Sequence, residues 1–315
     1  MENVSGSVIL SIPIIDMQKF PDEEEYKKLR EACDEWGCFR VMNHSLPKNL
    51  MEEMKKVVTC LYERPREIKK RNVDTVIGSG YTYFPLHPVF ENMGFHDFGS
   101  SLDIDNFCSQ LDASPHDKKI IRAYGEAVQE LAVDIARKIK ECVVGLSEAM
   151  DFQDWRCNCK MNKYSFTPET VGHVGIHEHT DPGFLSVVQD DDLVDGLEVL
   201  HPPSGSFVPV PPLSGTFVIN LGDVAHVWSN GRFPDVIHRV QCKEGRTRIS
   251  IVTSLQAPRH GDVEVAKEFV DSDHPPLFMP FNFERYIESR WTKNIRNGEA
   301  LDLLRVDLPS NSVSA

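Results

Sequence analysis

A histidine and an aspartate stand two residues apart in His179-Thr180-Asp181. In a strand, residues i and i+2 point to the same side, so this imidazole and this carboxylate can reach one metal ion. His238 lies on a second predicted strand further along the chain. Two imidazoles and one carboxylate leave open positions on Fe(II) for O2 and a chelating co-substrate. Zinc with a hydrolytic water uses the same residue types, so the spacing alone leaves both metals open.

Other histidines compete for these positions. His177 shares a strand face with His179 if the strand is regular, and His226 is an alternative to His238. The H-x-D spacing favours His179, and the offset to Arg248 favours His238. We expect His44 to be a structural, hydrogen-bonding residue rather than a ligand.

Arg248 and Ser250 also point to one side of a predicted strand. A guanidinium forms two parallel hydrogen bonds with a carboxylate, and a neighbouring hydroxyl adds a third donor. A dicarboxylate could therefore chelate the metal at one end and bind this pair at the other. The alternative for Arg248 is an ion pair on the surface.

Short β-rich runs separated by turns follow Lys160, and their spacing is typical of an antiparallel sandwich or barrel. We expect strands at Met161–Phe166, Phe184–Gln189, Leu197–Leu200, Phe207–Val210, Thr216–Leu221, Ile237–Cys242 and Arg248–Ser254. Two further strands, Val8–Ile15 and Cys38–Met42, are expected in the first half.

The first half of the chain is otherwise helical in pattern. Helices are predicted over Asp22–Trp36, from Ser45 and Pro47 onward, and from Ser114-Pro115 to about Val144. At the start of the last of these helices, the cap residue Ser114 precedes a proline at the first helical position. The segment Arg64–Asp105 is interpreted as long loops with short strands. A helix is expected near Phe283–Ser289, with another possible within Lys293–Leu304. These helices need a sheet to bury their apolar stripes, which favours one structural unit.

The chain has 315 residues and a net charge of −14, which disfavours nucleic acids and anionic membranes as partners. Met1–Gly6 lacks a basic region, and the apolar run Val8–Ile15 is too short to span a membrane. We therefore expect a cytoplasmic protein, and a monomer. The acidic run Asp190-Asp191-Asp192 fits no calcium motif and is expected to be a solvated turn.

Taken together and in order, these motifs resemble those of the plant 2-oxoglutarate- and Fe(II)-dependent dioxygenases. The resemblance extends to Trp36–His44, to Asn162-Lys163-Tyr164, to Asn220–Asp223 and to Trp228–Gly231, and covers the chain from Ile12 to about Phe281. It implies an α+β fold with a distorted double-stranded β-helix, or cupin-like jelly roll, as its core. The implied organisation is a helical region at 1–150, the oxygenase core at 151–285, and a C-terminal helix and tail at 286–315, all one structural unit.

The resemblance also implies roles. His179, Asp181 and His238 would hold Fe(II), and no other catalytic residue is implied. Arg248, Ser250 and Tyr164 would bind the distal carboxylate of 2-oxoglutarate, with Asn162 near the metal. O2 would be the second co-substrate and ascorbate the reductant. The reaction would be hydroxylation of a small, largely apolar plant metabolite.

Three runs are similar to the dioxygenases for auxin oxidation, which makes indole-3-acetate the first substrate to consider: Gly78–Tyr81, Asn106–Ser114 and His238–Glu244. The chain departs from them at Ile176–Glu178, at His226 and in Tyr83–Met93, so a hydroxylase of a steroidal alkaloid or terpenoid remains an alternative. So do a non-catalytic binding protein of this fold and an oxidase that works without 2-oxoglutarate. Six aromatic residues are candidates for contacting the substrate: Tyr81, Phe84, Phe95, Phe98, Phe281 and Phe283.

Overall fold

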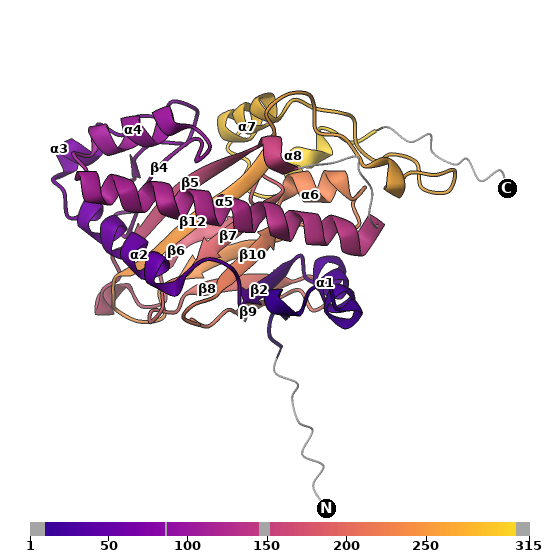
Figure 1. Cartoon of the computed structure of the whole chain (residues 1–315), viewed down its shortest axis with the longest axis horizontal. Helices are drawn as coiled ribbons and strands as arrows, with labels where there is room; N and C mark the ends of the chain where they lie inside the picture. The colour runs from indigo at the N-terminus through magenta and orange to yellow at the C-terminus, as the bar shows by residue number, and fades with distance from the viewer. Residues whose placement is uncertain (1–9, 86, 145–151, 307–315) are drawn as a thin grey trace, which may run out of the picture.

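Two β-sheets form the centre of the protein in the computed structural model, which describes residues 10–85, 87–144 and 152–306 (Figure 1). The major sheet has eight strands in the order β1 (Ile14–Asp16), β2 (Cys38–Met42), β10 (Phe217–Leu221), β7 (Leu185–Gln189), β12 (Arg248–Pro258), β5 (Trp155–Tyr164), β4 (Phe90–Phe95) and β3 (Thr82–Tyr83). The minor sheet has four, in the order β6 (Val174–His179), β11 (His238–Gln241), β8 (Leu197–His201) and β9 (Ser206–Pro209). This is the expected mixed α/β fold with a double-stranded β-helix core.

Strands β5 and β12 are the longest antiparallel pair, with Arg248 opposite Tyr164 and Ser250 opposite Asn162. Successive side chains on β5 point to opposite faces of the sheet. Its residues Cys157, Cys159 and Met161 are fully buried on one face. That outer face is covered by helices, whereas the inner face, which carries Asn162 and Tyr164, is the one that holds the polar residues described below.

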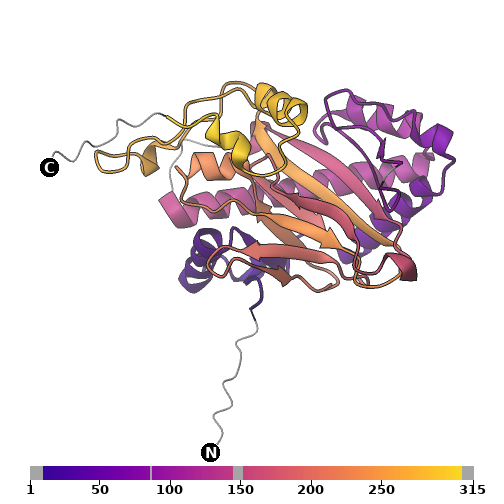
Figure 2. The ribbon, with the colours of Figure 1, turned by 180° about the vertical axis from the view of Figure 1, so that it is seen from behind.

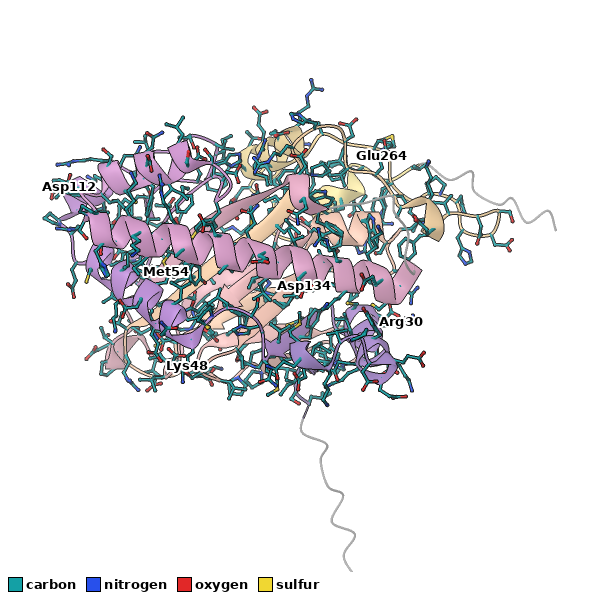
Figure 3. The ribbon with its side chains drawn as sticks, viewed as in Figure 1. Arg30, Lys48, Met54, Asp112, Asp134 and Glu264 are labelled. Carbon is teal, nitrogen blue, oxygen red and sulfur yellow. The ribbon has the colours of Figure 1, made fainter. Side chains whose placement is uncertain are left out.

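The helices are α1 (Glu23–Glu35), α2 (Lys48–Tyr62), α3 (Arg66–Lys69), α4 (Ser101–Gln110), α5 (Pro115–Val144), α6 (Asp223–Trp228), α7 (Phe283–Thr292) and α8 (Glu299–Asp302). The long α5 crosses the outer face of the major sheet in Figure 1, and the strands lie in front of it in the reverse view of Figure 2. It packs on α1, α2 and α4 and on strands β7 and β12. Met54 of α2, labelled in Figure 3, is fully buried in this layer.

Local sequence sets where α5 begins. The Ser114 hydroxyl accepts a hydrogen bond from the Asp117 N–H at 3.1 Å, and the Asp117 carboxylate accepts one from the Ser114 N–H at 2.9 Å. This reciprocal cap satisfies two donors that the first helical turn would otherwise leave unpaired. The helix start predicted at Ser114-Pro115 is confirmed.

All seven strands predicted after Lys160 are present, with ends that differ by a few residues. Residues Arg64–Asp105, in contrast, are more regular than expected. The segment contains α3, β3 and β4, and it also contains the start of α4, which the sequence interpretation missed. Ser100 caps α4 by accepting a hydrogen bond from the Asp103 N–H at 3.2 Å, a signal that serine followed by acidic residues could have supplied.

Strands of the N-terminal region complete the major sheet. β2 pairs with β10, and β4 pairs with β5, so residues before 100 form sheet pairs with residues after 150. Of the strand expected at Val8–Ile15, only Ile14 and Ile15 lie in β1, and Val8 and Ile9, like Met1–Gly6, are outside the described residues. Within 10–85, 87–144 and 152–306, no helix has both the length and the apolar character needed to cross a bilayer.

Candidate metal centre and co-substrate site

His179, Asp181 and His238 converge between the two sheets. Each offers one ligand atom, and these atoms all lie within 4.8 Å of one another. The His238 Nε2 and Asp181 Oδ2 atoms are 3.9 Å apart, and the two imidazole centroids are 4.2 Å apart. His179 ends β6 and His238 begins β11, and the two residues are directly opposite each other in the minor sheet. Among the described residues, this is the one group of three His, Cys, Asp or Glu side chains close enough to share an ion.

Hydrogen bonds orient both imidazoles. His179 Nδ1 lies 2.8 Å from the carbonyl oxygen of His177, and His238 Nδ1 lies 3.0 Å from that of Val236. Because a carbonyl oxygen can only accept, Nδ1 carries the proton in both rings. Each Nε2 is left with a free lone pair, which is the form that binds a metal.

The protonation states also fit a metal ion. Burial and the neighbouring His238 lower the pKa of His179 to about 3. Burial raises the pKa of the Asp181 carboxyl, but His238, His179, Ser186 and Arg290 together lower it further, so the net shift is downward. Neutral imidazoles and an ionised carboxylate are what metal binding requires. Asp181 Oδ2 is buried and has no hydrogen-bond partner among the described residues, as expected of an atom placed to coordinate an ion.

The competing histidines lie elsewhere. A bulge between β6 and β11 places an extra residue between Ile176 and His179, which breaks the alternation, and His177 is exposed. His226 Nδ1 donates to the carbonyl oxygen of Phe233 at 2.6 Å. His44 is not part of this cluster, and its ring centroid lies 4.8 Å from that of Phe217.

Thr180, between the two ligands of the H-x-D motif, is held by helix α7. Arg290 donates from Nη2 to the Thr180 carbonyl oxygen at 2.9 Å and from Nη1 to its hydroxyl at 3.2 Å. Arg290 is itself paired with the fully buried Asp223, which also accepts a hydrogen bond from the Tyr286 hydroxyl at 2.7 Å. The geometry of the ligand segment therefore depends on residues of α6 and α7, which sequence reasoning did not assign to the site.

The major sheet supplies a second cluster, on its inner face. Arg248 is only 1% exposed, so it is not a surface residue. Its guanidinium lies 5.0 Å from the centroid of the Tyr164 ring, and Ser250 accepts a hydrogen bond from the Asn162 amide at 3.5 Å. The structure thus brings together all four residues predicted to bind a dicarboxylate, on the adjacent strands β5 and β12.

Arg248 has hydrogen-bond donors that no described residue accepts from. Its Nη2 is paired with the carboxylate of Asp190, whereas Nε and Nη1 are buried without a partner among the described residues. Burial lowers the pKa of this guanidinium, but Asp190, Tyr164 and Asp191 together raise it further, so the net shift is upward. Two unpaired donors on a permanently charged group can form strong hydrogen bonds with a carboxylate.

The expectation of a solvated turn at Asp190–Asp192 is wrong. Asp190 and Asp191 are buried. Asp191 accepts hydrogen bonds from the N–H groups of Ile249, Leu193 and Val194. Arg248 pairs with Asp190, and the Ile249 N–H donates to Asp191, so both carboxylates have partners that allow their burial. These partners belong to β12, more than fifty residues later in the chain.

The six aromatic candidates are dispersed. Phe95 and Phe98 pack on each other, and they contact Phe107 of α4 and Tyr124 of α5, on the helical side of the sheet. Tyr81 donates its hydroxyl to Glu91 at 2.7 Å, and Phe84 is 48% exposed.

Phe281 and Phe283 are buried at the start of α7. The Phe281 ring packs 5.1 Å from that of Tyr286, the residue that bonds to Asp223.

Lys160 is a further inner-face residue that sequence reasoning passed over. It precedes Asn162 by two positions on β5, so the two side chains share a face. Burial lowers the pKa of its ammonium group, and the nearby carboxylates of Asp181 and Asp74 partly oppose this. The alternation of small apolar and polar residues along β5 was the available signal.

Comparisons with known proteins agree with this geometry. Residues 155–257, which span β5 to β12, match the 2OG-Fe(II) oxygenase superfamily. Residues 12–129 match the N-terminal region of a non-haem dioxygenase in morphine synthesis.

The chain is also similar to individual proteins over nearly its whole length. It is 43% identical to the 2-oxoglutarate-dependent dioxygenase DAO of Oryza sativa, over 93% of this chain and 98% of that protein. The crystal structure of the rice dioxygenase for auxin oxidation superposes with a TM-score of 0.86 at 43% identity, over 94% of this chain and all of that one. A binary complex of 2-oxoglutarate with dioxygenase for auxin oxidation 1 of Arabidopsis thaliana gives a TM-score of 0.80 at 47% identity, over 84% of this chain and all of that one.

Proposed function

This chain belongs to the 2OG-Fe(II) oxygenase superfamily, and we propose that within it the enzyme oxidises the auxin indole-3-acetate. The reaction class is that of its relatives: a dioxygenase that uses Fe(II), 2-oxoglutarate and O2. The observation that supports indole-3-acetate as the substrate is the 43% sequence identity to the rice enzyme. This similarity extends over 93% of the chain and includes both functional clusters.

The residues divide into two sets by sheet. We assign His179, Asp181 and His238 as the Fe(II) ligands, because their ligand atoms converge and the lowered pKa values of His179 and Asp181 suit a divalent cation. When bound, Fe(II) supplies the redox chemistry that couples decarboxylation of 2-oxoglutarate to oxidation of the substrate by O2.

Arg248 is assigned to the distal carboxylate of 2-oxoglutarate, with Ser250 and Tyr164 beside it and Asn162 nearer the metal. The two free donors of Arg248 are already buried and oriented by Asp190, so little ordering is needed when the co-substrate binds. Arg248 lies on the major sheet, whereas His179 and His238 lie on the minor sheet. A dicarboxylate that reaches from Arg248 to the metal is therefore fixed at both ends. This orientation is the main contribution of the protein to the reaction.

We further propose that the enzyme acts as a cytoplasmic monomer with no nucleic-acid or membrane partner. The net charge of −14 supports the second part, since phosphate-rich surfaces repel such a chain. Size-exclusion chromatography with light scattering tests the first, and a particle of twice the chain mass would refute it.

The test of function is a turnover assay with Fe(II), ascorbate, 2-oxoglutarate and indole-3-acetate under 18O2. We expect one product with a single labelled oxygen, formed together with succinate, and no product when 2-oxoglutarate is left out. The matched negative control is the variant Asp181→Ala, which removes a ligand. A wild-type enzyme that releases succinate with a neutral terpenoid or alkaloid and leaves indole-3-acetate unchanged would refute the proposed substrate.

A further inference from the structure

The inner face of β5 carries a cation, Lys160, that forms no ion pair within 4.0 Å among the described residues. Other cations near the site do have partners. The pairs are Arg248 with Asp190, Arg290 with Asp223, and Arg156 with Glu284. An unpaired ammonium group in a partly buried position is costly unless something else neutralises it.

The surroundings of Lys160 place its ammonium group at the Gly78 loop, on the face of β5 that also carries Asn162. A Cβ atom built on Gly78 would lie 3.7 Å from Lys160 Nζ and 3.3 Å from the Trp291 ring. Of the ionised groups in the described chain, Asp181 acts most strongly on Lys160, followed by Asp74. The ammonium group therefore lies at the Gly78 loop, close to Trp291 of α7 and within electrostatic reach of Asp181.

Neither carboxylate is free to serve as its partner. Asp181 is needed by the metal, as argued above. Asp74 accepts hydrogen bonds from the N–H of Gly78 at 3.1 Å and from that of Gly80 at 2.5 Å, one on each carboxylate oxygen. Asp74 thus fixes the glycine loop over Lys160, and it forms no ion pair with Lys160 within 4.0 Å.

Helix α7 closes the other side of this position. Glu284 at the start of α7 pairs with Arg156 at 2.7 Å, and Trp291, seven residues later, reaches the Gly78 loop beside Lys160. Residues seven apart lie on one face of a helix, so α7 runs along the inner face of β5 from Arg156 to Lys160. An aromatic ring and a cation at one position suit a ligand that has both an aromatic part and a negative charge.

The sum of formal charges at the metal site also favours a role for Lys160 in binding an anionic substrate. Fe(II) contributes two positive charges, and Asp181 and 2-oxoglutarate contribute three negative ones, while Arg248 is offset by Asp190. Lys160 brings this site to neutrality before substrate binds. Without it, an anionic substrate would enter a site that already carries a net negative charge.

We propose that Lys160 is the residue that binds the carboxylate of the substrate, and so selects a small aromatic acid over its neutral counterparts. This inference rests on the proposed function, since it assumes an anionic substrate. Lys160 would be a binding and specificity residue that leaves the metal and the co-substrate in place.

The test compares indole-3-acetate with indole-3-acetamide, which has the same shape and no charge. Equilibrium binding of each is measured by calorimetry with Mn(II) in place of Fe(II), with 2-oxoglutarate and without O2. We expect Lys160→Met to weaken indole-3-acetate binding roughly 10- to 100-fold, the effect of losing a charge-assisted hydrogen bond, and to leave the amide nearly unchanged. Lys160→Arg should retain part of the preference for the acid.

Lys163→Met is the matched control. Lys163 is on the same strand but faces the helices, where it lies 3.4 Å from Glu91, and Glu91 keeps Lys69 at 2.7 Å as a partner. The acid-to-amide ratio is internal to each variant, so a partly unfolded sample does not affect it.

Two failures can be told apart. An unchanged ratio in Lys160→Met, with wild type still binding the acid, would overturn the role of Lys160 alone. A wild-type enzyme that binds 2-oxoglutarate but not indole-3-acetate would overturn the proposed function and this inference with it.

Discussion

Arg290 donates a hydrogen bond to the carbonyl oxygen of Thr180 at 2.9 Å, and Thr180 lies between the metal ligands His179 and Asp181. A helix near the C-terminus of the described chain is thereby connected to the metal centre through one buried side chain. The pair Arg290–Asp223 fixes the backbone from which both ligands project.

Replacing Arg290 should therefore weaken metal binding without removing a ligand. Loss of such supporting contacts typically costs about 10- to 100-fold in metal affinity, and we expect Arg290→Met to fall in this range for Mn(II). Titration followed by electron paramagnetic resonance gives the affinity. Arg285→Met is the control, because Arg285 is on the same helix but exposed. Equal affinities in the two variants would contradict a positioning role.

Arg248→Ala should raise the KM for 2-oxoglutarate by about 100-fold, because a buried, charge-assisted double hydrogen bond is lost. Arg248→Lys should be intermediate, since an ammonium keeps the charge but not the planar fork. Metal affinity measured without 2-oxoglutarate should stay as in wild type. Steady-state kinetics with varied co-substrate check this, and an unaltered KM would refute the assignment.

Asp190→Asn should destabilise the protein while it lacks co-substrate. The change leaves Arg248 as a buried charge without its partner, which costs about 3–5 kcal/mol. Added 2-oxoglutarate supplies a new carboxylate, so it should raise the Tm of the variant more than that of wild type. The control is Asp192→Asn, because Asp192 is half-buried and forms its ion pair with Lys55, at 3.3 Å, rather than with Arg248. If 2-oxoglutarate raised the Tm of Asp190→Asn less than that of wild type, the proposed binding of the co-substrate carboxylate by Arg248 would be contradicted.

The metal-free protein should lose stability as pH falls below about 6.5. An unfolded histidine has a pKa of about 6.5, whereas His179 in the folded protein has a pKa of about 3, so below 6.5 the unfolded state binds the proton first. The free energy of unfolding should fall by up to about 1.4 kcal/mol per pH unit between these values.

Urea unfolding at several pH values, in the presence of a chelator, measures this slope. His179→Gln should reduce it, whereas His173→Gln, at an exposed turn of the same segment, should not. Identical slopes in wild type and His179→Gln would show that another group is responsible.

Much of this site could be predicted from the sequence because its signals are local. His179 and Asp181 are two residues apart, as are Arg248 and Ser250, and strand alternation on β12 places the second pair on one face. His179 instead ends β6, and Asp181 follows the end of that strand. The turns and β-rich runs after Lys160 likewise predicted the strands of the core, except β6, which was not among the predicted runs. What the pattern could not supply was the sheet to which each strand belongs.

The missed features depend on contacts between distant segments. Asp190 looked like a solvated residue because Arg248, its partner, is far along the chain. Lys160 was passed over, since its position at the Gly78 loop, within electrostatic reach of Asp181, follows only from the fold. His177 was separated from His179 by a bulge that no spacing rule reveals.

The pairing of β2 with β10 also bears on how the enzyme is made. Residues 38–42 leave the ribosome early, yet their sheet neighbour is Phe217–Leu221. Through most of synthesis this strand has an unsatisfied edge, and the long helix α5 has no completed sheet on which to dock. Contacts so distant in sequence slow folding and expose nascent chains to aggregation. The same architecture that joins the first strands to the core thus makes assembly a late event, dependent on nearly the whole polypeptide.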